Sequence, residues 1–311
     1  MKNKYIKLVI IFISILFLTG CVTRLEDQEG NLVKEPNSGQ TLTENILCQP
    51  RDSEIISLYE ENGVDIDELP KCSDFTITTG GYEGIWSSLF IKPLATLIIF
   101  IGERVGNYGL SIVLSTLVIR ILMSPITKKS AEQSEKMKKA RPDLDELEKK
   151  YKSTKNDDRD AMMKKSQETM MIYKKHGISP ASGCIFSFIQ IPLFFAYYQS
   201  LMRIPVIYEQ SFLGLNLGTN PSTAFASGNY YYIFTMLILL ATTYYSFKLT
   251  GSAATTQDQE KQMQFMMKIM IIFILFASFT LPTALAVYWI TNSTFTIYQN
   301  VLSKRRNAND K

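Results

Sequence analysis

The sequence predicts an all-α membrane protein with five transmembrane helices, and three observations predict it. The chain has 311 residues, of which 46% are hydrophobic and only 20% are charged. Apolar segments about 20 residues long, the length that a bilayer-spanning helix needs, alternate with strongly charged segments. The net charge is only +4, yet lysine and arginine are concentrated in the segment 128–177 and in the tail after residue 302. This unevenness decides the topology.

The first residues have the pattern of a bacterial secretory signal. Three lysines precede an apolar run over 8–18, and small residues then lead to Cys21. A cysteine directly after Thr-Gly resembles the lipobox, in which the thiol is acylated and becomes the mature N-terminus. We therefore expect a signal peptide over 1–20, a palmitate-type lipid on Cys21, and residue 22 onward outside the cell. The alternative is an uncleaved anchor that ends in cysteine.

An acidic segment, 21–83, follows and lacks a long apolar run. Its carboxylates far outnumber its four basic residues, so the segment can cross the membrane without violating the positive-inside rule. Cys48 and Cys72 both lie in it, in a compartment that permits disulfides. A disulfide between them and two free thiols are the two alternatives.

The apolar segments that follow are 86–102, 109–127, 181–202, 229–248, 265–281 and 283–301. The positive-inside rule places the basic segment 128–177 and the tail in the cytoplasm, and the loop 204–228, which has no Lys or Arg, outside. Since residue 22 is also outside, only one of the first two apolar segments crosses the membrane. We assign 109–127 as the first span, because Lys92 and Pro93 interrupt the shorter 86–102.

The segment 86–102 is then expected to be an amphipathic helix on the outer surface. Trp86, Leu89 and Phe90 would lie at the interface, with Lys92 reaching for water. The predicted parts are the signal peptide 1–20, the extracellular segment 21–83, the interfacial helix and first span over 84–127, a cytoplasmic helical hairpin over 128–177, spans two to five over 178–302, and a basic cytoplasmic tail over 303–311.

The cytoplasmic segment 128–177 contains two charged helical patterns, the second from about Arg159 to Lys175, with turn residues over 153–157 between them. Its modest apolar content predicts a loosely packed, mobile hairpin. A docking arm for a partner and a solvated loop are the two interpretations.

Arg120 lies in the middle of the first span. A central arginine costs roughly 2.5–3.5 kcal/mol on insertion scales, so it requires water, a partner or a function. No Asp or Glu lies in the other four predicted spans. A water-filled cavity open to the cytoplasm would satisfy the charge, and snorkelling to the inner surface is the alternative.

Polar residues on the other predicted spans support such a cavity. Thr116, Arg120 and Ser124 recur every four residues and share one helix face. Trp289 and Asn292 likewise share a face of the last span. The candidate groove residues are Arg120, Thr116, Ser124, Gln190, Trp289 and Asn292. Simple hydrogen bonding between helices is the alternative for each polar residue.

A positively charged, hydrated groove predicts a mechanism without hydrolysis. An acidic segment of a client protein would be held at Arg120 while its apolar segment partitions into lipid. The sequence has no Gly-x-x-x-x-Gly-Lys loop for nucleotides. It has a single histidine and no Cys-x-x-Cys pair, so we expect no enzyme activity, metal or cofactor. A small-solute transporter or channel is the alternative function, although the chain has no evident repeat.

Four groups of residues carry a family resemblance over about 84–305. They are Gly84-Ile85-Trp86 with Lys92-Pro93-Leu94; Tyr108-Gly109-Leu110 through Arg120; His176-Gly177-Ile178-Ser179-Pro180 with Gly183-Cys184 and Ile189-Gln190-Ile191-Pro192; and Leu281-Pro282-Thr283-Ala284 with Tyr288-Trp289-Ile290-Thr291-Asn292. Together they resemble the YidC/Oxa family of membrane protein insertases in its shorter Gram-positive form. Ser179-Pro180 departs from the family's usual Asn-Pro, and Pro282-Thr283-Ala284 from its Pro-Ser-Gly.

The resemblance implies five helices around a groove open to lipid and cytoplasm, in a multi-pass protein of the bacterial cell membrane. A family arginine matches Arg120, and a family tryptophan matches Trp289. The implied function is insertion and folding of nascent membrane proteins, alone or with the Sec translocon. The implied partners further include ribosomes, the signal-recognition machinery and membrane lipids, with no specific nucleic-acid binding.

Overall fold

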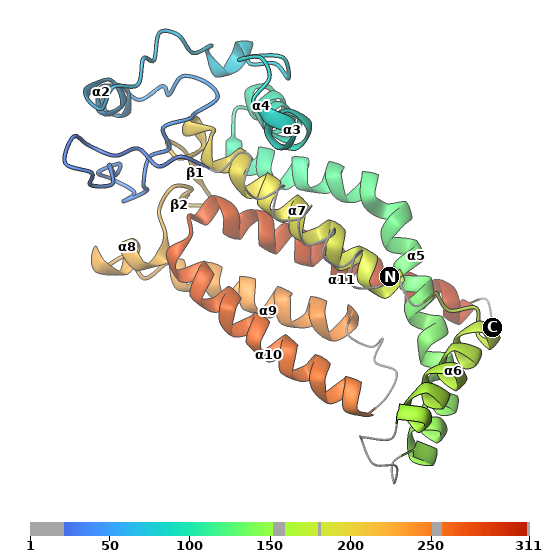
Figure 1. Ribbon diagram of the computed structural model, residues 1–311. Coiled ribbons are helices and arrows are strands. Elements are labelled where there is room, and N and C mark those ends of the chain that lie inside the picture. The colour runs from blue at the N-terminus through green and yellow to red at the C-terminus, as the bar shows by residue number, and fades with distance from the viewer. Residues whose placement is uncertain (1–21, 152–158, 180–181, 251–256, 310–311) are drawn as a thin grey trace. The chain divides into compact units, whose positions relative to one another are not determined.

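The computed structural model in Figure 1 describes residues 22–151, 159–179, 182–250 and 257–309. The signal peptide, Cys21 and the turn at 153–157 lie outside these residues. The chain is mostly helical and divides into two compact units. The first unit comprises Met1–Thr116, Ile191–Met236 and Ser278–Trp289, and the second comprises Leu117–Gln190, Leu237–Ala277 and Ile290–Lys311.

The regular elements are, in chain order, α2 (Ser53–Glu61), the 3₁₀ turn η1 (Cys72–Asp74), α3 (Gly84–Trp86), the π-helical turn η2 (Ser87–Ile91), α4 (Lys92–Val105), α5 (Tyr108–Tyr151), α6 (Arg159–Lys175), α7 (Ser182–Met202), the 3₁₀ turn η3 (Pro205–Ile207), β1 (Ser211–Phe212), β2 (Leu215–Asn216), α8 (Pro221–Ala226), α9 (Tyr232–Thr250), α10 (Gln257–Thr280) and α11 (Thr283–Asn309). The two short strands pair antiparallel, with Ser211 opposite Asn216.

Three helical segments in the described part of the chain are long and apolar enough to cross a membrane. They are Gly84–Val105, Tyr108–Lys129 and Tyr232–Leu249, and Met267–Thr280 is a shorter apolar helix. Two of the long segments lie where the sequence predicts spans. The third includes the helix that we assigned to the outer surface, although its length and composition would also allow it to cross.

The helix predicted over 86–102 is present and continuous, because α3, η2 and α4 follow one another without a break. Pro93 is the second residue of α4, and inside a continuous helix a proline leaves a carbonyl of the preceding turn without its usual N–H donor. The wider π turn of η2 directly precedes it, and such turns are an established way for a helix to absorb a local irregularity.

The expectation that Lys92 reaches for water is wrong. Its side chain is fully buried, and its Nζ donates to the carbonyl oxygens of Thr79 (2.7 Å) and Gly81 (2.6 Å) and lies 2.9 Å from Glu83 Oε1. An ammonium group has three donors, and these three acceptors replace its hydration. The segment before the helix folds back onto Lys92, which a pattern of apolar residues cannot reveal.

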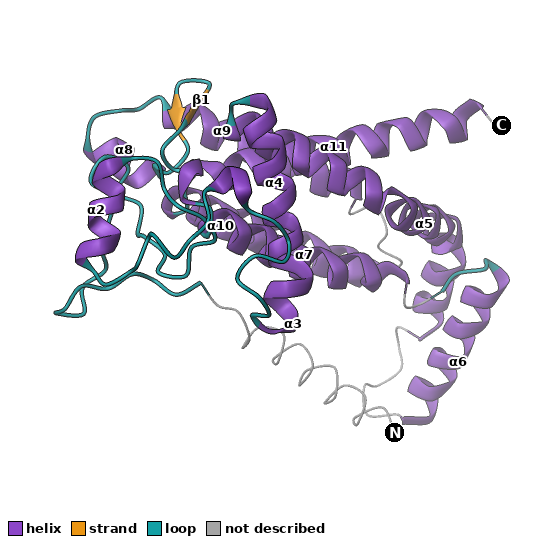
Figure 2. Ribbon diagram, turned by 90° about the horizontal axis from the view of Figure 1, so that it is seen from above, coloured by secondary structure: helices purple, strands orange, loops and turns teal. Residues whose placement is uncertain are grey.

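Helix α5 is 44 residues long and continues past the predicted end of the first span at 127, through Pro125 and Pro142. Its C-terminal part pairs with α6, as Figures 1 and 2 show. Ala140, Leu144 and Ile178 form a small buried cluster between the two arms. α6 covers the residues of the second predicted helical pattern. The small core agrees with the modest apolar content of this segment.

Ion pairs join the same two arms of this hairpin. Lys150 Nζ and Tyr151 Oη each donate to Glu168 at 2.8 Å. Asp143 Oδ2 accepts from Lys175 Nζ at 2.7 Å, and its hydrogen bonds to Lys175 and His176 lower the pKa of Asp143 below its ordinary value. These pairs are exposed, and exposed pairs typically stabilise by less than about 1 kcal/mol each. The hairpin therefore depends on several weak contacts.

The last two helices, α10 and α11, are linked by only two residues, as expected from predicted apolar segments that end at 281 and begin again at 283. Thr283 donates through both its N–H (3.1 Å) and its hydroxyl (2.7 Å) to the carbonyl of Thr219, and the N–H of Ala284 donates to Leu217 O (2.9 Å). These contacts satisfy N–H groups at the start of α11 that have no intrahelical partner. The helix extends to Asn309, so most of the predicted tail continues it.

The segment 22–83, which the sequence predicts to lie outside the cell and which we call the external segment, is mainly loop and contains the short helix α2 (Figure 2). Asp52 caps α2 by accepting from the N–H of Glu54 at 2.8 Å, and Cys48 and Cys72 are joined by a disulfide. Its core consists of Leu25, Leu42, Ile46, Ile55, Tyr59 and Ile66. The cluster is small, so the disulfide closes a segment that has few other buried apolar side chains.

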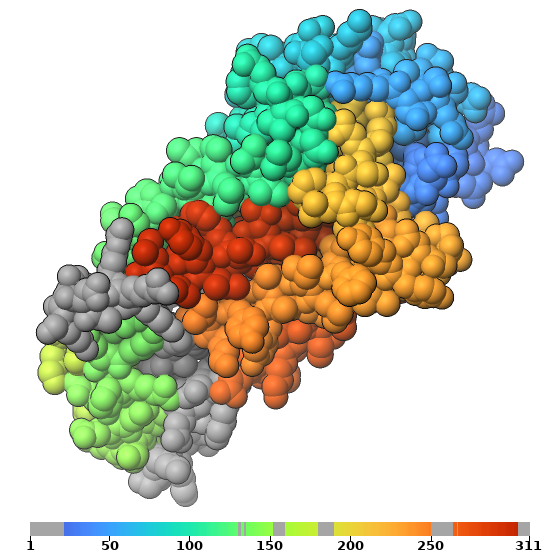
Figure 3. Space-filling model, turned by 180° about the vertical axis from the view of Figure 1, so that it is seen from behind, coloured from blue at the N-terminus to red at the C-terminus, as the bar shows by residue number. Residues whose placement is uncertain are grey.

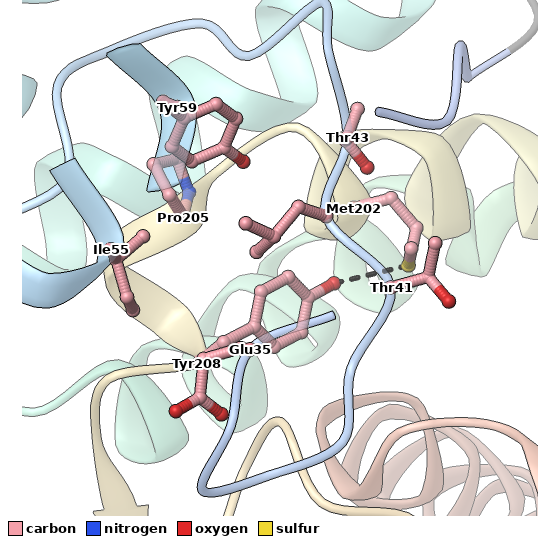
Figure 4. A pocket seen from close by; sticks show the side chains of 9 residues that line it. Glu35, Thr41, Thr43, Ile55, Tyr59, Met202, Pro205 and Tyr208 are labelled. Carbon is pink, nitrogen blue, oxygen red and sulfur yellow. Dashed lines mark hydrogen bonds between the residues drawn. The ribbon is translucent and has the colours of Figure 1, made fainter. Parts of the chain in front are cut away.

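The external segment packs on the loop that follows α7. Figure 3 shows the blue segment against the yellow residues of that loop, and Leu47 N–H donates to Arg203 O at 2.8 Å. Figure 4 shows a cavity at this joint, where Tyr208 Oη donates to Met202 Sδ at 3.2 Å. The cavity has room for about one water molecule and none for a polypeptide. It is a packing feature.

Glu209 provides a second contact between the loop and the external segment. Its Oε1 accepts from the backbone N–H groups of Arg51 (2.8 Å) and Asp52 (3.3 Å). Burial raises the pKa of Glu209 above its ordinary value, and these hydrogen bonds and the charge of Arg51 only partly oppose the rise. The ionised carboxylate therefore costs folding free energy, which the protonated form does not.

We expect Glu209→Gln to stabilise the protein at neutral pH. Glutamine keeps an oxygen for the two N–H donors and removes the buried charge. Because the folded pKa is raised, the wild type loses stability as the pH rises through the interval from the ordinary to the raised pKa. The advantage of the variant should therefore shrink as the pH falls from about 7 to about 4.5. Thermal unfolding in detergent at both pH values measures it, with the exposed Glu60→Gln as control. A variant less stable than wild type at neutral pH would contradict this account.

Candidate functional site

Arg120 is buried, with only 4% of its surface exposed, although it lies within the apolar stretch of α5. Its Nε donates to the side-chain oxygen of Asn292 on α11 at 2.5 Å. Both residues belong to the second unit. The predicted groove residues Arg120 and Asn292, 172 positions apart in the chain, are thus brought into direct contact.

Thr116 takes part in a different contact. Its side chain is buried in the first unit, and its hydroxyl donates to Ile112 O at 2.6 Å and to Tyr197 Oη at 3.3 Å. Bonding to the carbonyl four residues earlier is common for threonine in helices. Tyr197 also shares a hydrogen bond of 2.7 Å with Ser115. Thr116 therefore contributes to the packing of α5 on α7.

Trp289 is half-buried in an aromatic cluster of the first unit. Its ring meets the ring of Phe194 edge-on at 5.1 Å, and Tyr197 stacks on Tyr288 with ring centroids 4.2 Å apart. Aromatic pairs at these separations are attractive beyond the area that they bury. The cluster connects α7 to the start of α11.

Ser124 and Gln190 belong to the second unit and are both half-buried. The backbone carbonyl of Ser124 accepts from the hydroxyl of Thr127 at 3.0 Å. Of the six predicted groove residues, Arg120 and Asn292 are joined by a hydrogen bond, while Thr116 and Trp289 contact α7. Among the described residues, no three His, Cys, Asp or Glu side chains are grouped so that they could hold a metal ion.

Sequence reasoning missed Arg203, which follows the last residue of α7 and is 3% exposed. Its Nη2 lies 2.6 Å from Glu83 Oε2. A signal was available, since an arginine at the outer end of a predicted span departs from the positive-inside rule and requires a counter-charge. The apolar pattern alone did not identify which carboxylate supplies it.

The chain is similar to known membrane proteins. The family model described as "60Kd inner membrane protein" matches residues 100–310. The chain is 35% identical over 229 residues to "Membrane protein insertase YidC" of Oceanobacillus iheyensis, covering 72% of this chain and 85% of that protein. It is 34% identical over 221 residues to "Membrane protein insertase MisCA" of Bacillus subtilis, covering 70% and 79%.

A solved structure, "Active YidC insertase crystal structure with the first transmembrane domain resolved", has the same fold, with a TM-score of 0.50 and 23% identity. The similarity covers 79% of this chain and 52% of that one, so the chain spans about half the length of the solved protein. The family match covers two thirds of the chain and includes Arg120, Trp289 and Asn292. The chain therefore belongs to the 60Kd inner membrane protein family and is a membrane protein insertase of the YidC type.

Proposed function

We propose that this insertase holds the acidic, hydrophilic segment of a nascent membrane protein at Arg120, in a groove open to the cytoplasm and to lipid. The observation that carries the proposal is a buried arginine within an apolar helix, with Asn292 on its Nε. A cation in a medium of low dielectric attracts a carboxylate much more strongly than it does in water. Ser124 and Gln190, which belong to the same unit as Arg120, are proposed to line the groove with it.

The proposed driving force is the transfer of the client's apolar segment into lipid. Each CH₂ group removed from water contributes about 0.8 kcal/mol, so a spanning segment of about 20 residues supplies far more than is needed to move a short polar tail. Arg120 would lower the barrier by holding the tail part-way across. Insertases of this family are not enzymes, and no covalent step is required.

The proposed topology has five spans, in α5 up to about residue 127, α7, α9, α10 and α11, with α4 on the outer surface. Residues 21–83 would be external, and 128–177 and 303–311 cytoplasmic, by the positive-inside rule. The hairpin of α5 and α6 would then face ribosomes and the signal-recognition machinery, and the spans would face lipid and the Sec translocon.

We further propose that residues 1–20 are a signal peptide and that Cys21 is acylated, on the strength of the Leu-Thr-Gly-Cys pattern. Cells fed labelled palmitate should incorporate it into the wild-type protein and not into Cys21→Ser. Equal labelling of both proteins would rule out Cys21 as the acceptor.

The direct test of the insertase mechanism uses liposomes that contain only this protein. A small single-span client with an acidic N-terminal tail is added, and insertion is scored by protease protection. Insertion well above that into empty liposomes is the expected result. No insertion, together with an ion flux through the same liposomes, would favour a channel or transporter.

A further inference from the structure

Three charged side chains meet at the outer end of α7: the two cations are buried, and the carboxylate between them has a side chain that is 31% exposed. They are Glu83, Lys92 and Arg203, and we call them the ionic latch. Glu83 is central, since its Oε1 lies 2.9 Å from Lys92 Nζ and its Oε2 lies 2.6 Å from Arg203 Nη2. One carboxylate thus joins the first residue of α4 to the residue that follows α7.

The latch draws most of its acceptors from the external segment 22–83. Arg203 donates through Nε to Asn45 O at 2.6 Å and through Nη1 to Ser87 Oγ at 2.9 Å. Lys92 and Arg203 each have three acceptor atoms, counting one oxygen of Glu83 for each. Five of these six atoms lie in the external segment, and only Ser87 Oγ does not. Every donor position of Lys92 is used.

The charges make Glu83 hard to replace. Lys92 is fully buried and Arg203 is 3% exposed, so removal of the carboxylate would leave two buried cations without the counter-charge that they share. Burial by itself would raise the pKa of Glu83, but hydrogen bonds and charges from the two cations outweigh burial and lower its pKa below the ordinary value. Glu83 is therefore ionised at neutral pH.

The latch lies beside two further contacts between the α3–α4 region and α7. Trp86 Nε1 donates to Gln199 Oε1 at 2.6 Å, and Ser200 Oγ donates to Ile91 O at 3.1 Å. α7 in turn carries Phe194, which contacts Trp289, and Tyr197, which bonds to Thr116. A shift of α4 on α7 would thus reach Thr116 and Trp289, two of the candidate residues that the sequence predicts.

We propose that Glu83 is a positioning residue through which the external segment holds α4 against the outer end of α7, and that client insertion depends on this latch. The dependence of client insertion on the latch rests on the proposed function. The external segment 22–83 would thereby have a role, although it lies entirely before the part of the chain that the family model matches, which begins at residue 100.

The test compares Glu83→Gln with Glu68→Gln, an exposed carboxylate of the same segment. The chain has two tryptophans, so Trp86 fluorescence is measured in a Trp289→Phe background and insertion in the native background. We expect Glu83→Gln to increase acrylamide quenching of Trp86 and to slow insertion about tenfold, because the neutral amide leaves the buried cations Lys92 and Arg203 without a counter-charge. Glu68→Gln should match the wild type in both measurements.

A second variant keeps the test informative if Glu83→Gln does not fold. Arg203→Lys retains the charge, but an ammonium group cannot reproduce the fork of a guanidinium that bonds Asn45, Ser87 and Glu83 at once. It should give intermediate quenching and intermediate insertion at temperatures where it remains folded.

Three outcomes would overturn the inference. Unchanged quenching and insertion in Glu83→Gln would show that the latch is dispensable. Slow insertion with Trp86 still protected would exclude positioning through α4, and increased quenching with normal insertion would exclude the dependence of insertion on the latch. If the wild type itself inserts no client, the proposed function fails, while Trp86 quenching still decides whether Glu83 holds α4.

Discussion

Arg120→Ala should slow the insertion of a client with an acidic tail by at least about tenfold in liposomes that contain only this protein, which corresponds to about 1.4 kcal/mol. The reason is electrostatic, because Arg120 is 4% exposed and lies in an apolar helix, where a cation and a carboxylate attract each other more strongly than in bulk water. Alanine leaves a neutral site next to Asn292, whose amide cannot replace the full charge. Protease protection of the client's tail measures the effect.

Two comparisons separate charge capture from loss of structure. Arg120→Lys keeps a cation at the site and should retain most of the insertion of the acidic client. A client whose tail carries amides in place of carboxylates should depend much less on Arg120. If Arg120→Ala inserts the acidic client at the wild-type rate, the charge-capture mechanism is wrong, and Arg120 has at most a tuning role for this client.

Removal of the disulfide by Cys48→Ala together with Cys72→Ala should destabilise the external segment by about 3–4 kcal/mol. The two cysteines are 24 residues apart and enclose α2, whose Ile55 and Tyr59 contribute to the small core of the segment. Without the cross-link, the unfolded segment gains the chain entropy of that loop. A core of this size leaves little stability in reserve.

Limited proteolysis of the full protein in detergent micelles measures this effect, since the segment is expected to open locally while the membrane helices remain folded. The double variant should be cleaved within 22–83 much faster than the wild type. Reduction of the wild type with dithiothreitol should reproduce the change, and the variant should be insensitive to the reductant. Equal cleavage of oxidised wild type and variant would show that the segment does not need the cross-link.

The sequence predicted those features that depend on local composition. Apolar runs placed the apolar part of α5 (Tyr108–Lys129), α9 and the joint between α10 and α11 close to their observed bounds, because burial in an apolar environment demands such runs whatever the neighbours are. The same reasoning identified Arg120, since a charge in an apolar helix is conspicuous in the sequence alone. The helix of the second arm of the hairpin was predicted from about Arg159 to Lys175, and α6 has these bounds.

The tertiary structure decided which polar groups meet. Sequence spacing placed Thr116 on the face of Arg120, yet its hydroxyl bonds to Tyr197 and Ile112. Lys92 was expected in water because a lone lysine in an apolar stretch usually reaches for it, and only folding shows that Thr79, Gly81 and Glu83 surround it. Hydrogen bonds and ion pairs act over a few ångströms between residues far apart in the chain, so the sequence by itself determined the helices and the family, and the fold alone determined their polar partners.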